Sequence, residues 1–157
     1  MIQQGQTLPA ATLSQLTKDG MVQHPTAELF AGKKAVVFAV PGAFTPTCSE
    51  AHLPGYVVLA DQLKAKGVDF IACVSVNDAF VMKAWGEAQN ASELMMLADG
   101  DGSFTKALGL EMDTAGFGGV RSQRYAMVVD NGVVTTLNVE APKSFEVSKA
   151  EVILAAL

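Results

Sequence analysis

The sequence predicts an α/β fold with a mixed central sheet flanked by helices. Two continuous apolar runs, residues 35–40 and 68–76, are rich in β-branched residues, as expected of strands buried on both faces of a sheet. Between them, residues 56–66 place apolar side chains on one face and lysines near the end, which indicates a helix. Strand, helix and strand form a βαβ unit with parallel strands. Pro54 and Gly55 should kink or interrupt the helix.

Two tight turns predict antiparallel hairpins. Near the N-terminus, residues 11–24 are broken by an Asp-Gly pair, which supplies the turn conformations that short hairpins need. Near the C-terminus, strands expected at 124–129 and 133–139 flank an Asn-Gly pair, the strongest short hairpin signal. The sheet should therefore combine parallel strands with antiparallel ones and begin with an N-terminal β-hairpin.

The remaining elements are helices at 79–88 and 152–157 and a short strand at 94–98. Asn77 or Asp78 should cap the first of these helices. Ser148 and Glu151 form a capping-box pattern ahead of the second. Because no internal repeat or linker interrupts the pattern, we expect residues 1–157 to form a single domain.

The composition argues against several classes of function. Half of the 157 residues are apolar, enough for a sizeable core, and the net charge of −5 comes from acidic residues spread along the chain. We therefore expect no nucleic acid and no membrane partner. No signal peptide or membrane-spanning run is visible, which favours a soluble, cytoplasmic protein. Two cysteines and two histidines do not form a closed zinc site, so no metal is expected.

The segment with the clearest chemical pattern is 40–55, VPGAFTPTCSEAHLPG, at the exit of the first buried strand. Ligands of open α/β sheets bind beyond the carboxyl ends of the strands, where helix N-termini present unsatisfied N–H groups. Cys48 falls in or next to the first helical turn, which favours the thiolate. Gly42 permits a tight approach, and Thr45 can place its hydroxyl in the same volume. Without these neighbours, Cys48 would be interpreted as a small buried apolar residue.

The spacing of Pro41, Thr45 and Cys48, P-x-x-x-T-x-x-C, resembles the active-site signature of the peroxiredoxins, which have a thioredoxin-like fold. The string PGAFTPTCS followed by HLPG is similar to the type II subgroup. The likeness extends through KGVDFIACVSVNDAFVMKAW, LADGDGSF and RSQRYAMVVDNG, and so covers nearly the whole chain.

The resemblance implies an antioxidant thiol peroxidase that acts in cell redox homeostasis. In this family the cysteine matching Cys48 attacks hydrogen peroxide or an alkyl hydroperoxide and becomes a sulfenic acid. Glutathione with glutaredoxin, or thioredoxin, would restore the thiol. No cofactor is implied because the sulfur carries the two electrons, and a homodimer is implied by the family alone. Phe44 would pack in the active-site loop, across a dimer contact or in the core.

The resemblance also implies an arginine, and Arg124 occupies the matching position. If the strand that Arg124 begins runs antiparallel to 35–40, it lies at the same edge of the sheet as Cys48. A guanidinium there would stabilise the thiolate and bind the peroxide, with Thr45 as another donor. Arg121 is the alternative, and either arginine could instead be a solvated surface charge.

His52 and Cys73 are further candidates. His52 follows Cys48 by one helical turn and could be a proton relay, an orienting group or a packed histidine that supports the loop. Cys73 matches the second cysteine of plant type II members. It lies in the middle of a buried strand. The helix after Cys48 descends further than the return strand climbs before Cys73, so Cys73 falls several ångströms short of Cys48 and a resolving role is disfavoured. We expect a functionally one-cysteine enzyme.

Two other functions remain open at this point. A redox sensor would use the oxidation of Cys48 to signal to a protein partner, with turnover only incidental. A thioredoxin-like disulfide reductase is less consistent with the sequence, since that chemistry relies on C-x-x-C and Thr45 occupies the place of the first cysteine.

Overall fold

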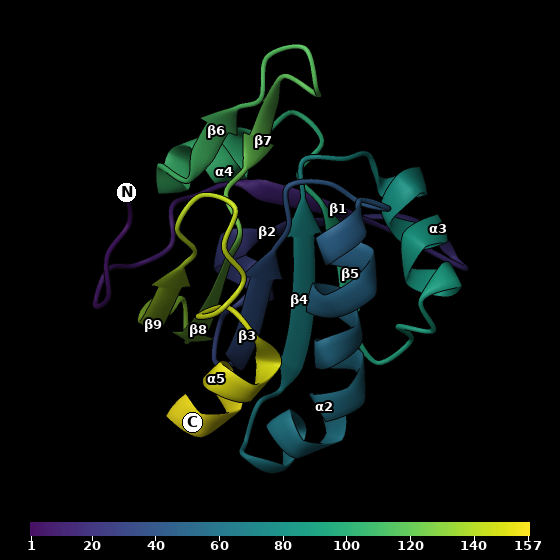
Figure 1. Cartoon of the computed structure of the whole chain (residues 1–157). Helices are drawn as coiled ribbons and strands as arrows, with labels where there is room; N and C mark the ends of the chain where they lie inside the picture. The colour runs from purple at the N-terminus through teal and green to yellow at the C-terminus, as the bar shows by residue number, and fades with distance from the viewer.

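The computed structural model describes all 157 residues and contains a seven-stranded mixed sheet of order β2-β1-β5-β4-β3-β8-β9 (Figure 1). Its strands are β1 (Thr12–Thr17), β2 (Gly20–Pro25), β3 (Lys34–Ala39), β4 (Phe70–Ser75), β5 (Met95–Ala98), β8 (Tyr125–Asp130) and β9 (Val133–Val139). Strands β3, β4 and β5 are parallel, and β8 runs antiparallel to β3. The predicted mixed sheet and βαβ unit are confirmed. A separate two-stranded ribbon joins β6 (Glu111–Asp113) to β7 (Val120–Ser122).

Helices cover both faces of the sheet (Figure 1). They are α1 (Thr26–Leu29), α2 (Leu53–Ala65), α3 (Ala79–Ala88), α4 (Ser103–Leu108) and α5 (Ala150–Ala156), with a π-helical turn η1 (Cys48–His52) directly before α2. Tyr56, Trp85 and Ile153 of α2, α3 and α5 pack in one apolar cluster, while Phe104 of α4 belongs to the cluster on the opposite face. None of the helices is long and apolar enough to cross a membrane.

Both predicted hairpins are confirmed. Strands β1 and β2 pair antiparallel around the Asp-Gly turn, with Thr17 opposite Gly20. Strands β8 and β9 pair antiparallel around Asn131 and Gly132, whose φ angles of 49° and 81° fit the mirror-image turns that two-residue hairpins prefer. The second hairpin matters for the site because it fixes where β8 begins.

The start of α2 differs from the prediction. Pro54 and Gly55 do not interrupt this helix, because Pro54 lies in its first turn, a position that tolerates proline. The irregularity lies one turn earlier, in η1, where the N–H of Leu53 bonds to the carbonyl of Cys48.

Helix capping also needs a correction. Asp78, one of the two predicted caps of α3, accepts from the N–H of Val81 at 2.9 Å. Ser148, however, does not cap α5: Lys149 is the N-cap residue and makes no side-chain bond there. The hydroxyl of Ser148 donates instead to the carboxylate of Glu140, at 2.7 Å.

Candidate active site

The chain between β3 and α2 brings Cys48 to the carboxyl edge of the parallel strands. Pro46 and Thr47 already have helical conformation, and the first helical hydrogen bond runs from the N–H of Ser49 to the carbonyl of Thr45, at 2.9 Å. The N–H groups of Thr47 and Cys48 precede this bond and have no acceptor within the chain. The positive end of the helix therefore presents two free donors beside the cysteine.

Arg124, directly before β8, contacts the sulfur of Cys48. Because β8 runs antiparallel to β3 with Tyr125 opposite Ala39, Arg124 lies at the edge where β3 ends. Its Nη2 is 3.1 Å from the Sγ of Cys48, whose side chain has no exposed surface. A guanidinium at this distance stabilises negative charge on the sulfur.

His52 holds the other nitrogen of the same guanidinium. Nη1 of Arg124 lies 2.9 Å from Nδ1 of His52, while Nε2 lies 3.1 Å from the carbonyl of Ser148. Since a carbonyl only accepts, Nε2 carries the proton and Nδ1 offers its lone pair to Arg124. Burial, followed by the charge of Arg124, lowers the pKa of His52 to about 3, so the ring is neutral at pH 7. The π-turn lets Cys48 and His52 face one guanidinium.

Thr45 and its neighbours form a hydrogen-bonded loop. The hydroxyl of Thr45 donates to the carbonyl of Gly42 at 2.7 Å, so its proton is already used and its lone pairs remain available. This corrects the expectation that Thr45 acts as a donor. A Cβ on Gly42 would lie 3.2 Å from Cγ2 of Thr45, a tight contact that favours glycine here. The amide oxygen of Asn77 accepts from the N–H of Ala43 at 3.0 Å and anchors the loop to the end of β4.

The structure brings Arg121 to a different place. Its Nε donates to the carbonyl of Gly118 at 3.0 Å, and its Nη1 donates to the carbonyl of Val76 at 2.6 Å. Arg121 thus holds the loop that follows β6 against the end of β4. It makes no contact with Cys48, whereas Arg124 does.

Cys73 lies in the middle of β4, opposite Phe38 of β3 and Met96 of β5. Its side chain is fully buried, and both cysteines are free thiols. Burial, followed by the proximity of Cys48, raises the pKa of Cys73 well above its usual value. Cys73 belongs to the same apolar cluster as Cys48 but makes no hydrogen bond to a donor.

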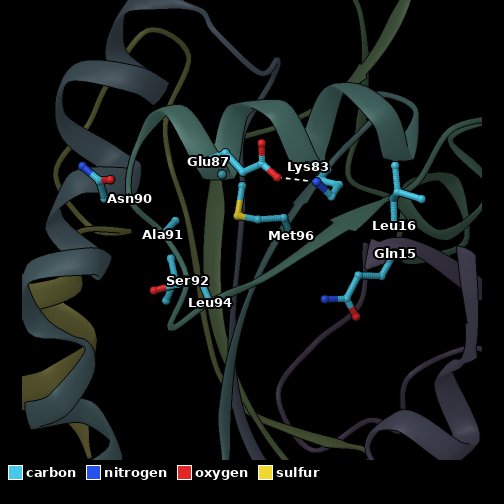
Figure 2. Close-up of a pocket in the computed structure, with 10 residues that line it drawn as sticks. Gln15, Leu16, Lys83, Glu87, Asn90, Ala91, Ser92, Leu94 and Met96 are labelled. Carbon is cyan, nitrogen blue, oxygen red and sulfur yellow. Dashed lines mark hydrogen bonds and ion pairs between the residues drawn. The ribbon is translucent and has the colours of Figure 1, made fainter. Parts of the chain in front are cut away.

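A pocket of about 640 Å³ opens beside Arg124. Pro41 and Thr47 line it on the side of the cysteine loop, and Met112, Pro142 and Phe145 add apolar side chains to its wall. A second pocket, of about 330 Å³, lies between α3 and strands β1 and β5, next to the Lys83–Glu87 ion pair (Figure 2). Arg124, which contacts Cys48, lines the first pocket and not this one, so the site chemistry lies beside the first pocket.

Sequence reasoning did not identify Glu140, Ser148 or Asn77 as parts of this site. The sequence predicts Asn77 only as a helix cap, although a polar residue just beyond a strand end is a recognisable signal. No sequence signal could have located the contact of Ser148 with His52, because 96 positions separate the two residues.

The fold and the thiol site define a redoxin, and the redoxin family model matches residues 3–154. Reduced Prx3 from Vibrio vulnificus, solved in complex with hydrogen peroxide, is 86% identical, with 99% of each chain covered and a TM-score of 0.98. The oxidised form of that protein is 87% identical over 100% of each chain, with a TM-score of 0.94.

Plant relatives indicate the subgroup of the family to which the chain belongs. Peroxiredoxin-2E-2, chloroplastic, from Oryza sativa subsp. japonica is 55% identical over 98% of this chain and 71% of the relative. Peroxiredoxin-2C from the same organism is 51% identical over 98% of this chain and 96% of the relative. The chain belongs to the type II peroxiredoxins, with a thioredoxin-like fold, and is a thiol-dependent peroxidase.

Proposed function

We propose that Cys48 is the peroxidatic nucleophile and that it reduces hydrogen peroxide and alkyl hydroperoxides. The observation that supports this most strongly is the 3.1 Å contact between Nη2 of Arg124 and Sγ of Cys48, made beside the two free N–H groups of Thr47 and Cys48. A buried thiol without these groups would have no means of holding a negative charge.

The proposed step is an in-line attack of the thiolate on the terminal oxygen of the peroxide. The S–O bond forms as the O–O bond breaks, giving the sulfenic acid of Cys48 and an alkoxide or hydroxide that takes a proton from water. The sulfur supplies both electrons, so the step uses no metal and no organic cofactor. Arg124 and the free N–H groups stabilise the charge as it moves from sulfur to the leaving oxygen.

Three other residues near Cys48 have supporting roles: one binds the peroxide, one shields the reacting atoms and one orients Arg124. Thr45 has its hydroxyl proton on Gly42, so we assign it the role of accepting the O–H of the peroxide. Pro41 forms one wall of the pocket and shields the reacting atoms from water. His52 is an orienting group, since its only free lone pair is bonded to Arg124 and is not available as a base.

The pocket supports a substrate range beyond hydrogen peroxide. Its volume of about 640 Å³ is far larger than two oxygen atoms need, and Met112, Pro142 and Phe145 give it an apolar wall. An alkyl group would lie there while the peroxide oxygens approach Cys48. The Vibrio vulnificus relative solved with hydrogen peroxide supports the smaller substrate.

Regeneration would use an external thiol: glutathione with glutaredoxin, or thioredoxin. Cys73 is buried in the middle of β4, and bridging it to Cys48 would require local unfolding. Attack by the first external thiol on the sulfenic acid releases water and leaves a mixed disulfide. A second thiol then restores Cys48 and leaves as a disulfide.

We also propose a homodimer that acts in the cytoplasm. Three exposed aromatic side chains flank the loop between β4 and α3: Phe44, Phe80 and Phe117 are 55%, 66% and 74% exposed. Arg121 ties the loop of Phe117 to Val76, and Phe44 lies against Trp85 of α3. A second copy would cover such a surface. Sedimentation of Phe80→Glu should show monomers if this surface is the interface, and fractionation of cells tests the compartment.

Steady-state peroxide consumption tests the proposed function and its rivals. Turnover with glutathione plus glutaredoxin, set against thioredoxin, measures activity and donor together. Oxidation of Cys48 without turnover by any donor would favour a redox sensor. Reduction of insulin disulfides without peroxide consumption would favour a disulfide reductase.

A further inference from the structure

Next to Arg124 lies a carboxylate that accepts several hydrogen bonds from one loop. Glu140 follows β9 and is 7% exposed. Its Oε2 accepts three hydrogen bonds: from the N–H of Glu146 at 2.8 Å, from the N–H of Ser148 at 2.8 Å and from the hydroxyl of Ser148 at 2.7 Å. These bonds close the segment 140–148 into a compact loop, which we call the Glu140 loop.

The Glu140 loop reaches the cysteine through a continuous chain of contacts. The carbonyl of Ser148, fixed by the two bonds that its own N–H and hydroxyl make to Glu140, accepts from Nε2 of His52 at 3.1 Å and from the hydroxyl of Tyr56 at 2.7 Å. That carbonyl sets the tautomer of His52, which leaves Nδ1 as the acceptor for Arg124. Nη2 of Arg124 then points at Sγ of Cys48.

Glu140 lies next to Arg124 without neutralising it. The backbone N–H of Glu140 donates to the carbonyl of Arg124 at 2.9 Å, yet the two side chains form no ion pair. Burial raises the pKa of Glu140, but the hydrogen bonds from Ser148 and Glu146 outweigh this effect and leave the pKa below its usual value. The carboxylate is thus charged and is bonded through Oε2 to the loop, and the guanidinium remains available to sulfur and substrate.

We propose that Glu140 is a positioning residue for peroxide reduction: through Ser148 and His52 it fixes the direction in which Arg124 presents Nη2 to Cys48. This inference rests on the proposed role of Cys48 and extends it. The same loop supplies Pro142 and Phe145 to the substrate pocket, and the ring of Phe145 lies 5.1 Å from that of His52. The wall of the pocket and the orientation of the arginine are therefore held by one carboxylate.

The variant Glu140→Ala tests the proposal, with Glu151→Gln as the matched control. Glu151 is exposed and lies near Tyr56, and the side chain of Glu151 makes no hydrogen bond. Its variant therefore removes the same charge without touching the Glu140 loop. The second-order rate constant for Cys48 oxidation, followed by alkylating unreacted thiol and mass spectrometry, should fall about tenfold to a hundredfold in Glu140→Ala and stay unchanged in Glu151→Gln.

A spectroscopic readout separates positioning from general loss of structure. The nitrogen-15 shifts of His52 should show a single Nε2–H tautomer in the unaltered chain and a mixture in Glu140→Ala. Should Glu140→Ala not fold, Glu140→Gln, which keeps the shape and removes the charge, takes its place. A rate within about twofold of the unaltered chain, or a slower rate with unchanged His52 shifts, overturns the proposal. Failure of the unaltered chain to oxidise Cys48 would instead overturn the proposed function, and this inference with it.

Discussion

Cys48 and Cys73 lie in the same apolar cluster, and neither side chain has exposed surface, yet their surroundings differ in charge and in free donors. Cys48 lies in the first turn of a helical segment, where its own N–H and that of Thr47 have no acceptors, and its sulfur receives a hydrogen bond from Arg124. Cys73 lies in the middle of β4, where burial raises the pKa of its thiol and every neighbouring backbone group belongs to the sheet. Burial alone therefore does not distinguish the two thiols. The donors that face the sulfur do, and on them rests our proposal that Cys48 is the reacting thiol.

The largest effect is expected from removing the sulfur that has these donors. Cys48→Ser should abolish peroxide consumption and leave the melting temperature nearly unchanged, because a serine hydroxyl stays protonated where a thiol ionises. The measurement is steady-state turnover with each thiol donor. If Cys48→Ser retained turnover, Cys48 would not be the reacting thiol, and the proposed difference between the two cysteines would be wrong.

The next largest effect should come from the arginine. Arg124→Gln should lower the rate constant for Cys48 oxidation about tenfold to a thousandfold, by analogy with the loss of one oxyanion donor. Arg121→Gln is the matched control, since Arg121 bonds only to the carbonyls of Gly118 and Val76. Stopped-flow kinetics with hydrogen peroxide measures both. An unchanged rate in Arg124→Gln together with a reduced rate in Arg121→Gln would show that Arg121, and not Arg124, has this role.

The low pKa of His52 predicts that the stability of the folded chain depends on pH. The pKa of His52 is about 3 in the folded chain, below the ordinary value of 6.5, so the unfolded chain binds this proton first. The stability that His52 contributes is present above pH 6.5 and is lost as the pH falls toward 3, by about 1.4 kcal/mol per pH unit. In His52→Gln, the free energy of unfolding, measured with denaturant at several pH values, should change less steeply with pH in this window. His24→Gln, which alters a half-buried histidine on the hairpin, should change the slope less, and equal changes would contradict the assignment.

Much of the fold follows from local patterns in the sequence. The buried apolar runs identify β3 and β4, and the Asp-Gly and Asn-Gly turns fix both hairpins because few residues tolerate their backbone angles. Arg124 is expected from the family resemblance, and the antiparallel direction of β8 agrees with its place beside Cys48. The π-turn at Cys48 could not be predicted, since residue propensities do not distinguish it from an α-helical turn. The Glu140 loop escaped prediction because its contacts with His52 join distant segments, and the capping pattern at Ser148 and Glu151 suggested a different partner for Ser148.

The smallest effect is expected from the second cysteine. Cys73→Ser should keep most of the turnover supported by glutathione and glutaredoxin, because its thiol takes no part in the proposed cycle. Any loss should appear in stability, since a hydroxyl replaces an apolar thiol in a packed strand. Comparing turnover with thermal unfolding of the same variant separates the two effects.

Mass spectrometry after one equivalent of hydrogen peroxide tests the central contrast most directly. The reduced protein is oxidised once, trapped with a sulfenic acid reagent or with glutathione, and digested. The account predicts the adduct on Cys48 and an unmodified thiol at Cys73. A stoichiometric disulfide between Cys48 and Cys73, with thioredoxin-driven turnover lost in Cys73→Ser, would contradict it and make Cys73 a resolving cysteine.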